Sequence, residues 1–298
     1  MQTDIYQRVT NQIVYALERG VKPWQRPWNV ENAGGRIIQP LRCNGVPYRG
    51  INVLSLWGEA LFKGFTTPVW LTFKQARELG GHVRKSEHGS LVVYASTLKQ
   101  SDADPVTGQE TERDIPFMKG YTVFNAEQIE GLPAHFYAKA APRTDSIMRL
   151  AAGDAFVNAT RATIRHGGGL AAYSQSADEI RMPPFAAFRD PESYYSTLIH
   201  ELTHWTKHKS RLDRDLGHKA WGDAGYAMEE LVAELGAAFV MAELDIEPAL
   251  REEHASYIAS WLKVLKNDRR AIFTAAAHAQ RAADYLRALQ PQAMRKAA

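Results

Sequence analysis

Apolar residues recur every three or four positions over several long stretches of the chain, a spacing that places them on one face of a helix. Near the start, this pattern predicts an amphipathic helix over residues 4–19 that ends at Gly20. The same periodicity predicts further helices over residues 51–63, 72–79, 146–165, 191–207, 226–242, 256–266 and 268–289. Helices are therefore expected in both halves of the chain.

Runs of alternating or β-branched residues predict short strands over residues 82–83, 91–96, 121–124, 171–174 and 179–182, the last two as a hairpin. Residues 100–114 are acidic and polar and contain Asp-Pro and Thr-Gly pairs, so we expect a surface loop there. Residues 131–145 contain two prolines and little periodic pattern, and we place a domain boundary in them. The order of elements predicts an α+β fold with one domain over residues 1–135 and a second over residues 146–298.

The composition is that of an ordinary water-soluble protein, with 45% hydrophobic and 23% charged residues in a chain of 298. Cys43 is the single cysteine, so no intramolecular disulfide can form and any metal site must use histidines and carboxylates. Charged residues interrupt the first helix, and no apolar run is long enough to span a bilayer. We therefore expect a cytoplasmic protein with no membrane contact.

A His-Glu-x-x-His motif lies in the helix predicted over residues 191–207: His200, Glu201 and His204 occupy its fixed positions. Side chains four positions apart on a helix lie about 40° apart around the axis and about 6 Å apart along it, so both imidazoles can bind one ion. Bound Zn²⁺ would lower the pKa of a water ligand to about 7, and Glu201 would take its proton. The alternative, two solvated histidines on a surface helix, is disfavoured by the apolar residues around the motif.

A catalytic zinc site needs a third protein ligand. The metzincin arrangement would place a histidine at position 210, which is Ser210, so that arrangement fails. His208 lies too far along the helix to share the ion, and His218 is an outside candidate.

The segment from Glu229 to Glu234 offers a better third ligand, because Glu230 and Glu234 share one face of the helix predicted over residues 226–242. The pair resembles the gluzincin pattern, in which the first carboxylate binds the metal and the second orients a metal-binding histidine. We therefore assign Glu230 as ligand and Glu234 as its outer partner, with Glu229 as the fallback ligand. An acidic, solvated helix face is the alternative, and the apolar neighbours weaken it. Tyr226, or else His218, could stabilise an oxyanion.

The basic residues are concentrated in the first third, where residues 1–99 hold 13 Lys and Arg against 6 Asp and Glu. Residues 100–140 hold 3 against 7, and the remainder hold 20 against 20. Cations that follow phosphates and flat rings that stack on bases are the combination used to bind single-stranded nucleic acid. The candidate contacts are Trp24, Arg26, Trp28, Arg42, Arg49 and Lys74. By contrast, Trp57, Trp70 and Phe73 are expected to be core residues.

Several motifs together resemble the ArdC-type antirestriction proteins, whose N-terminal domain also occurs in plasmid conjugative primases. The N-terminal half matches at Asp4-Ile5-Tyr6 with the Pro-Trp-x-x-Pro-Trp loop, Tyr48-Arg49-Gly50-Ile51-Asn52, Trp70-Leu71-Thr72-Phe73-Lys74-Gln75-Ala76 and Gly80-Gly81. The second half matches the zincin-like metallopeptidase domain at Tyr194-Tyr195, His200-Glu201-Leu202-Thr203-His204-Trp205-Thr206 and Glu229-Glu230-Leu231-Val232-Ala233-Glu234-Leu235-Gly236-Ala237.

This resemblance implies a mixed α/β domain that binds single-stranded DNA, followed by a zincin-like, gluzincin-type metallopeptidase domain. It also implies a plasmid protein that protects incoming DNA from host restriction endonucleases. The cofactor is expected to be Zn²⁺, with another divalent cation such as Mn²⁺ as the alternative. The expected partners are single-stranded DNA and a protein substrate, for which the host restriction enzyme is one candidate.

Two other readings fit the same residues. The protein could be a DNA-binding shield in which the metal site is structural or idle. It could instead be a zinc peptidase whose basic domain recognises protein rather than DNA.

Overall fold

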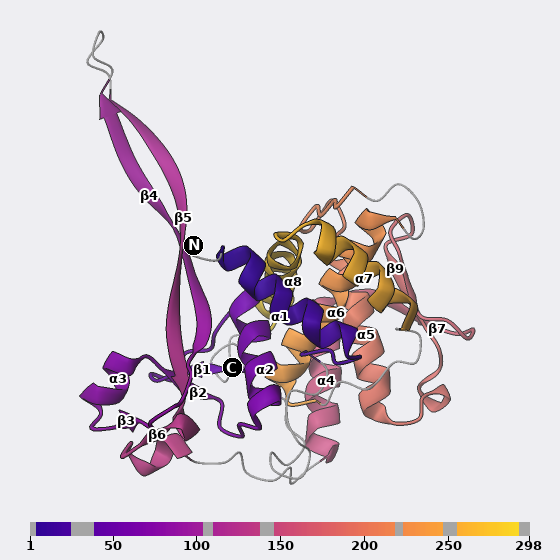
Figure 1. The fold of residues 1–298 in the computed structure, drawn as a ribbon. Coiled ribbons are helices and arrows are strands. Elements are labelled where there is room, and N and C mark those ends of the chain that lie inside the picture. Colours follow the sequence, from indigo (N-terminus) through magenta and orange to yellow (C-terminus); the bar gives the residue numbers. More distant parts are fainter. Residues whose placement is uncertain are drawn as a thin grey trace.

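The structure, a computed structural model, describes residues 4–24, 39–103, 110–137, 146–217, 223–246 and 255–291. An N-terminal part of mixed helices and strands lies beside a mainly helical C-terminal part (Figure 1). The expected α+β class is confirmed. None of the described helices combines the length and the apolar character needed to cross a membrane.

The N-terminal part is built around a four-stranded sheet in the order β1-β2-β5-β4. Its strands are β1 (Leu41–Arg42), β2 (Val69–Leu71), β4 (Ser90–Ala103) and β5 (Glu110–Asn125). A second, two-stranded sheet pairs β3 (His82–Val83) with β6 (Ile129–Glu130). The helices are α1 (Ile5–Glu18), α2 (Ile51–Lys63) and α3 (Phe73–Glu78), with 3-10 turns at Ala126–Gln128 and Ala134–Tyr137.

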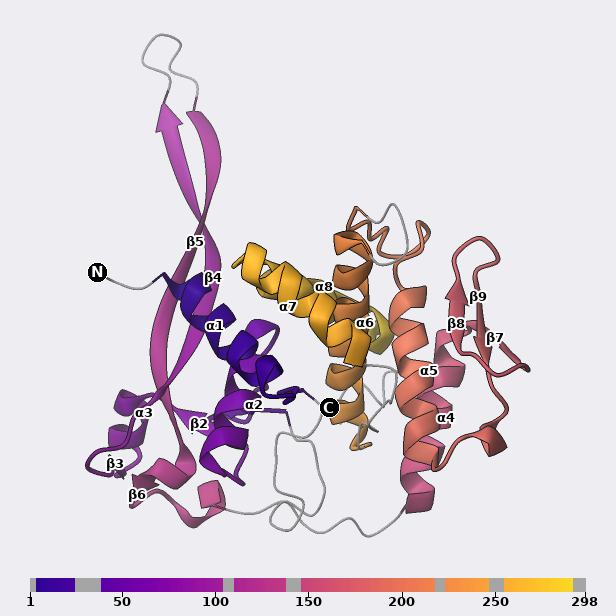
Figure 2. The same cartoon turned by 45° about the vertical axis from the view of Figure 1, so that its right-hand side comes forward.

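Strands β4 and β5 form a long two-stranded ribbon that projects away from the helices (Figures 1 and 2). Pairing runs from Ser90 opposite Val123 to Ala103 opposite Glu110. The surface loop expected over residues 100–114 is therefore wrong for most of its length, since strand continues at both ends of it. Backbone pairing does not depend on side-chain polarity, so strands can pair through a polar segment that shows no alternation of apolar residues in the sequence.

The C-terminal part places a small sheet against its helices. The helices are α4 (Ser146–Thr160), α5 (Pro191–Trp205), α6 (Ala224–Leu244), α7 (Ala255–Asn267) and α8 (Ala271–Ala288), with a 3-10 turn at Phe185–Ala187. The strands are β7 (Thr163–His166), β8 (Ala172–Ser174) and β9 (Glu179–Met182), in the order β7-β9-β8. The predicted hairpin of β8 and β9 is confirmed.

Helix α4 is shorter than the helix expected over residues 146–165, and its last residues form strand β7 instead. Arg161 has a φ of 56°, in the left-handed region, so the chain leaves the helical path directly after Thr160. The β-branched Thr163 and Ile164 then favour strand, and β7 pairs in parallel with β9.

One hydrophobic core joins the two parts of the chain. It runs from the buried residues of α1 and α2 to those of α7 and α8, and α7 also packs against α6 (Figure 2). Polar contacts cross the same boundary: the hydroxyl of Thr10 donates to the carbonyl of Arg269 at 2.7 Å, and the backbone N–H of Gly50 donates to Gln280 at 2.9 Å. The last two helices therefore tie the N-terminal part to the metal-site region.

Candidate metal centre

Helix α5 carries the His-Glu-x-x-His motif, and its start is well defined by sequence. Asp190 accepts a hydrogen bond from the backbone N–H of Ser193 at 2.7 Å, and Pro191 occupies the first helical position. Leu198 and Leu202 are buried, as are both imidazoles, with His200 5% and His204 7% exposed. Burial of both rings excludes the surface-helix alternative.

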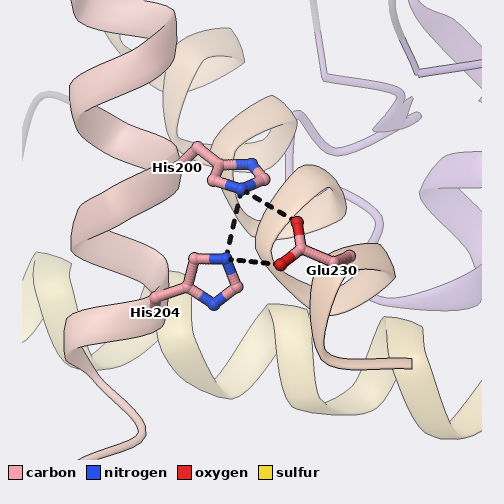
Figure 3. Close-up of side chains that lie close together, drawn as sticks. All are labelled: His200, His204 and Glu230. Atoms are coloured by element: carbon pink, nitrogen blue, oxygen red, sulfur yellow. Dashed lines mark hydrogen bonds and ion pairs between the residues drawn. The ribbon is translucent and has the colours of Figure 1, made fainter. Parts of the chain in front are cut away.

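Helix α6 crosses α5 and brings Glu230 to the two histidines (Figure 3). The Nε2 atoms of His200 and His204 lie 3.2 Å apart, and each lies 3.5 Å from an oxygen of Glu230. One ligand atom from each of the three residues lies within 4.8 Å of the other two. Among the described residues, this is the group of histidines and carboxylates that could hold a metal ion. The three side chains that the sequence predicts as ligands therefore converge.

The outer nitrogens of both rings face carboxylates. Nδ1 of His204 lies 3.0 Å from Oε1 of Glu229, and Nδ1 of His200 lies 3.6 Å from Oε2 of Glu234. A carboxylate at Nδ1 stabilises the tautomer with its proton there, which leaves the Nε2 lone pair free to bind metal. Two Nε2 lone pairs and a carboxylate then meet in one buried place. All three are acceptors, and none can donate a hydrogen bond to the others, so this arrangement fits a cation.

The acid–base properties of the site agree with a cation at its centre. Burial opposes a positive charge on His204, but the carboxylates of Glu229 and Glu230 outweigh burial and raise the pKa of His204 to about 9. Burial likewise opposes ionisation of Glu230, but the two histidines hold its pKa well below the ordinary range. The carboxylates around His204 therefore favour positive charge at the centre of the site.

Arg214 anchors the carboxylate behind His204, a role that no feature of the sequence indicated. Its guanidinium donates to both oxygens of Glu229 at 2.8 Å, and its side chain is 1% exposed. Despite burial, Arg214 and His204 lower the pKa of Glu229 to about 2. Glu229 therefore lies on the outer side of His204, and the fallback assignment of Glu229 as metal ligand is wrong. Glu234 occupies the outer position predicted for it.

A pocket of about 250 Å³ opens onto the three convergent side chains. Glu201 lines it, and its Oε2 accepts a hydrogen bond from the backbone N–H of Tyr173 in strand β8 at 2.8 Å. Tyr226 also lines the pocket, with its hydroxyl 3.0 Å from that of Tyr257 in α7. Tyr257 was missed because its helix is distant in sequence from both motifs.

His208 does not join the site. Helix α5 ends at Trp205, so His208 lies beyond it, with Nδ1 2.8 Å from the hydroxyl of Ser210. His218 lies outside the described residues.

The residues predicted to contact nucleic acid differ in their burial and in their partners. Trp24 is fully buried, with its ring edge-on to Trp261 at a centroid distance of 6.0 Å, so the prediction that Trp24 contacts nucleic acid is wrong. A ring that packs in the core cannot stack on a base. Arg26 and Trp28 lie outside the described residues. Arg49 pairs with Asp284 of α8.

Helix α3 presents cations and a ring to solvent. Lys74 is 86% exposed in its side chain, and Phe73 is 54% exposed, so the expectation that Phe73 is a core residue is wrong. Phe73 directly follows the buried strand β2, but it is the first residue of helix α3, and the helix turns its side chain outward. Trp57 and Trp70 are fully buried, as expected. Arg42 is exposed, with its guanidinium 5.4 Å from the centre of the Tyr48 ring.

Comparison with known proteins agrees with this organisation. A family model described as the N-terminal domain of the anti-restriction factor ArdC matches residues 3–124, and one described as a zincin-like metallopeptidase matches residues 151–278. Two crystal structures of ArdC from plasmid R388 are similar to this chain. The metal-free form is 45% identical, covers 96% of this chain and 97% of its own, and has a TM-score of 0.79; the Mn(II)-bound form is 43% identical, with 96% and 98% covered and a TM-score of 0.78.

Two sequence relatives extend the comparison. The uncharacterized protein y4eC of Sinorhizobium fredii is 41% identical over 98% of this chain and 94% of its own length. The DNA primase TraC of Escherichia coli is 37% identical over 96% of this chain, which spans 27% of that much longer protein.

The fold and the site together define a protein of two different domains, in which a zincin-like metallopeptidase domain follows the N-terminal domain along the chain. With close relatives matched over nearly their whole length, the chain belongs to the ArdC family of antirestriction proteins.

Proposed function

We propose that this protein binds single-stranded DNA, protects incoming plasmid DNA from host restriction endonucleases in the cytoplasm, and hydrolyses peptide bonds at a zinc site in its C-terminal domain. The observation that carries the catalytic part is the meeting of His200, His204 and Glu230 at a pocket that also holds Glu201. Membership of the ArdC family supports the antirestriction part.

The donor set suits a zinc ion. Two imidazole nitrogens and one carboxylate oxygen are a common set of three protein ligands for catalytic zinc, which keeps a further position for water or substrate. His200, His204 and Glu230 would hold the ion, with Glu229 and Glu234 orienting the rings from behind. Another divalent cation can use the same donors, and one related ArdC structure is described as bound to Mn(II). When bound, a cation of this kind lowers the pKa of a water molecule and polarises a carbonyl group.

Glu201 is positioned to act as the general base. It lies next to His200 in sequence but leaves the helix about 100° away around the axis. Its carboxylate lines the same pocket as the three predicted ligands and is not one of the group that could hold a metal ion. The N–H of Tyr173 fixes one oxygen, Oε2, at 2.8 Å, which leaves Oε1 to accept a proton from water and pass it to the leaving amine.

Tyr226 is the candidate for stabilising the oxyanion. Burial, the hydroxyl of Tyr257 and the charge of Glu230 raise the pKa of Tyr226 above its ordinary range. The hydroxyl keeps its proton at neutral pH, as a tyrosine of ordinary pKa also does, and can donate a hydrogen bond to negative charge that develops on a substrate carbonyl.

The exposed side of α3 supports a nucleic-acid surface. Phe73, Lys74 and Arg77 are exposed together on this helix, which combines a flat ring with two cations. Bases stack on such rings while cations contact phosphates. Arg42 and Arg49 remain candidates, the latter through the half of its side chain that is exposed beside Asp284.

A Glu201→Gln variant tests the catalytic part. The amide cannot take a proton, so peptide hydrolysis should fall about 10²–10⁴-fold. Zinc stoichiometry, measured by mass spectrometry on the same preparations, should stay unchanged. Protection of plasmid DNA from a restriction endonuclease, measured in parallel, separates proteolytic from shielding function. Protection that survives in the variant supports the shield, with an idle metal site.

A Lys74→Ala/Arg77→Ala double variant tests the nucleic-acid part. Each lost phosphate contact should reduce the dependence of log affinity on log salt by about 0.7 for a single strand. A labelled oligonucleotide titrated between low and moderate salt measures this slope. The matched control is Arg165→Ala/Arg181→Ala, which removes two exposed cations from the small C-terminal sheet. An unchanged slope in the first variant argues against the α3 surface, and no oligonucleotide binding by the wild type favours protein recognition by this domain.

A further inference from the structure

The segment that follows α1, residues 21–24, reaches from the N-terminal part to the metal centre. Lys22 lies in it with a side chain that is 8% exposed, and its Nζ is 3.9 Å from Oε1 of Glu234. Glu234 is buried to the same degree, at 7% exposed in its side chain. A carboxylate that is removed from water is costly unless a positive group or hydrogen-bond donors compensate it.

The two carboxylate oxygens of Glu234 face different parts of the protein. Oε1 faces Lys22, while Oε2 lies 3.6 Å from Nδ1 of His200. The carboxylate thus bridges an ammonium group of the N-terminal part and a metal-binding ring of the C-terminal domain. At 3.6 Å the contact is longer than a hydrogen bond, so an ionised Glu234 acts on Nδ1 of His200 through its charge. The negative charge favours the tautomer with its proton on Nδ1, which leaves the Nε2 lone pair toward Glu230 and His204.

Aromatic packing holds the Lys22 ammonium in place. Its Nζ lies 5.9 Å from the centre of the Trp261 ring, over its face. Trp24 packs edge-on against the same ring, and the indole N–H of Trp261 donates to the carbonyl of Ala227 in α6 at 3.1 Å. Residues 21–24 are therefore fixed against the helix that carries Glu230 and Glu234.

We propose that Lys22 is a positioning residue of the metal centre, and that through Glu234 it holds the His200 ring in its ligand orientation. The proposal rests on the proposed metal site. It means that the N-terminal part completes the outer layer of a site whose ligands all come from the other domain.

Replacing Lys22 by methionine tests the proposal, because Met keeps the length of the side chain and removes the charge. The zinc dissociation constant, measured by competition with a chromophoric chelator on the full chain, should rise about tenfold, the lower end of the effect of losing an outer partner of a metal ligand. Lys22→Arg, which keeps a cation beside Glu234, should recover most of that loss. Adding Lys22→Met to a Glu234→Gln variant should cause no further loss, because the cation acts through that carboxylate.

The matched control is Lys266→Met. Lys266 of α7 pairs with Glu18 of α1 at 2.6 Å, so this change also removes an ion pair between the two parts, but at the exposed surface. It should leave zinc affinity unchanged. Urea unfolding of the metal-free variants identifies any general loss of stability.

The outcomes separate this proposal from the proposed function. Failure of the wild-type protein to bind zinc refutes the metal site itself. Wild-type binding with equal affinity in the Lys22→Met variant, or equal losses in the Lys22→Met and Lys266→Met variants, refutes the positioning role of Lys22 alone. The Arg and double variants decide the matter even if Lys22→Met folds poorly.

Discussion

Removing Arg214 should destabilise the protein strongly, because it leaves a carboxylate buried without its main partner. The guanidinium makes four hydrogen bonds: two to Glu229 at 2.8 Å, one to the hydroxyl of Thr206 at 3.0 Å and one to the carbonyl of Thr203 at 3.0 Å. None of these groups is exposed to solvent that could replace the lost donors, since both Thr203 and Thr206 are fully buried.

The structure sets the size of the effect. Removal of one partner of a buried ion pair costs about 3–5 kcal/mol, since the remaining charge loses its compensation. An Arg214→Met variant should lose this amount of unfolding free energy in metal-free protein. Adding Glu229→Gln removes the stranded charge and should recover part of the loss, so the two changes should not be additive.

Urea unfolding, followed by tryptophan fluorescence in the presence of a chelator, measures this free energy without the ionic screening that guanidinium would add. The control is Arg165→Met. The side chain of Arg165 is 73% exposed and pairs with Glu179, so this change should cost less than about 1 kcal/mol. A loss for Arg214→Met no larger than that of the control would refute the role assigned to this side chain.

Three further changes test the packing, the capping and the acid–base state of the same region. A Cβ at Gly236 would meet Thr203 at 2.6 Å where α5 and α6 cross, so Gly236→Ala should cost about 1–3 kcal/mol in urea unfolding, whereas Gly58→Ala, with only ordinary contacts at 3.8 Å, should be neutral or stabilising. Asp190→Ala removes the N-cap of α5 and should lower stability by about 1 kcal/mol above pH 5, as measured by thermal unfolding. Burial and the nearby arginines lower the pKa of His278 from 6.5 to about 4, so protonation of this ring opposes folding. The melting temperature should therefore fall as the pH drops from 6.5 toward 4, and it should fall less steeply in the His278→Gln variant.

The metal ligands were predictable because local geometry defines most of the site. A helix places side chains at positions i and i+4 together whatever the rest of the fold, so His200 and His204 could be paired from sequence. Glu230 and Glu234 form a second such pair, and only the approach of α6 to α5 had to be assumed. The class of fold followed from the alternation of helical and strand patterns, and most helix bounds differ from prediction by a few residues at most.

The parts that escaped prediction depend on contacts between residues distant in sequence. Arg214, Tyr257 and Lys22 reach the site from a loop, from α7 and from the N-terminal part, and no spacing rule links them to the motif. The exposure of single aromatic residues could not be predicted for the same reason. Trp24 is buried and Phe73 is exposed, the reverse of what was expected, because neighbouring elements cover Trp24 and not Phe73.

The far end of the ribbon was missed because strand pairing there needs no apolar pattern. Residues beyond Leu98 on β4 pair with β5 through the backbone, so their polar sequence resembled a loop.

The most direct test of the central claim is a crystal structure of the zinc-loaded protein with anomalous diffraction data collected at the zinc edge. The account predicts one strong peak about 2.0–2.2 Å from Nε2 of His200, Nε2 of His204 and a carboxylate oxygen of Glu230, with Glu201 beside it and not bound to it. A peak held by other side chains, or no peak at this place in a protein that has bound zinc, would contradict the account.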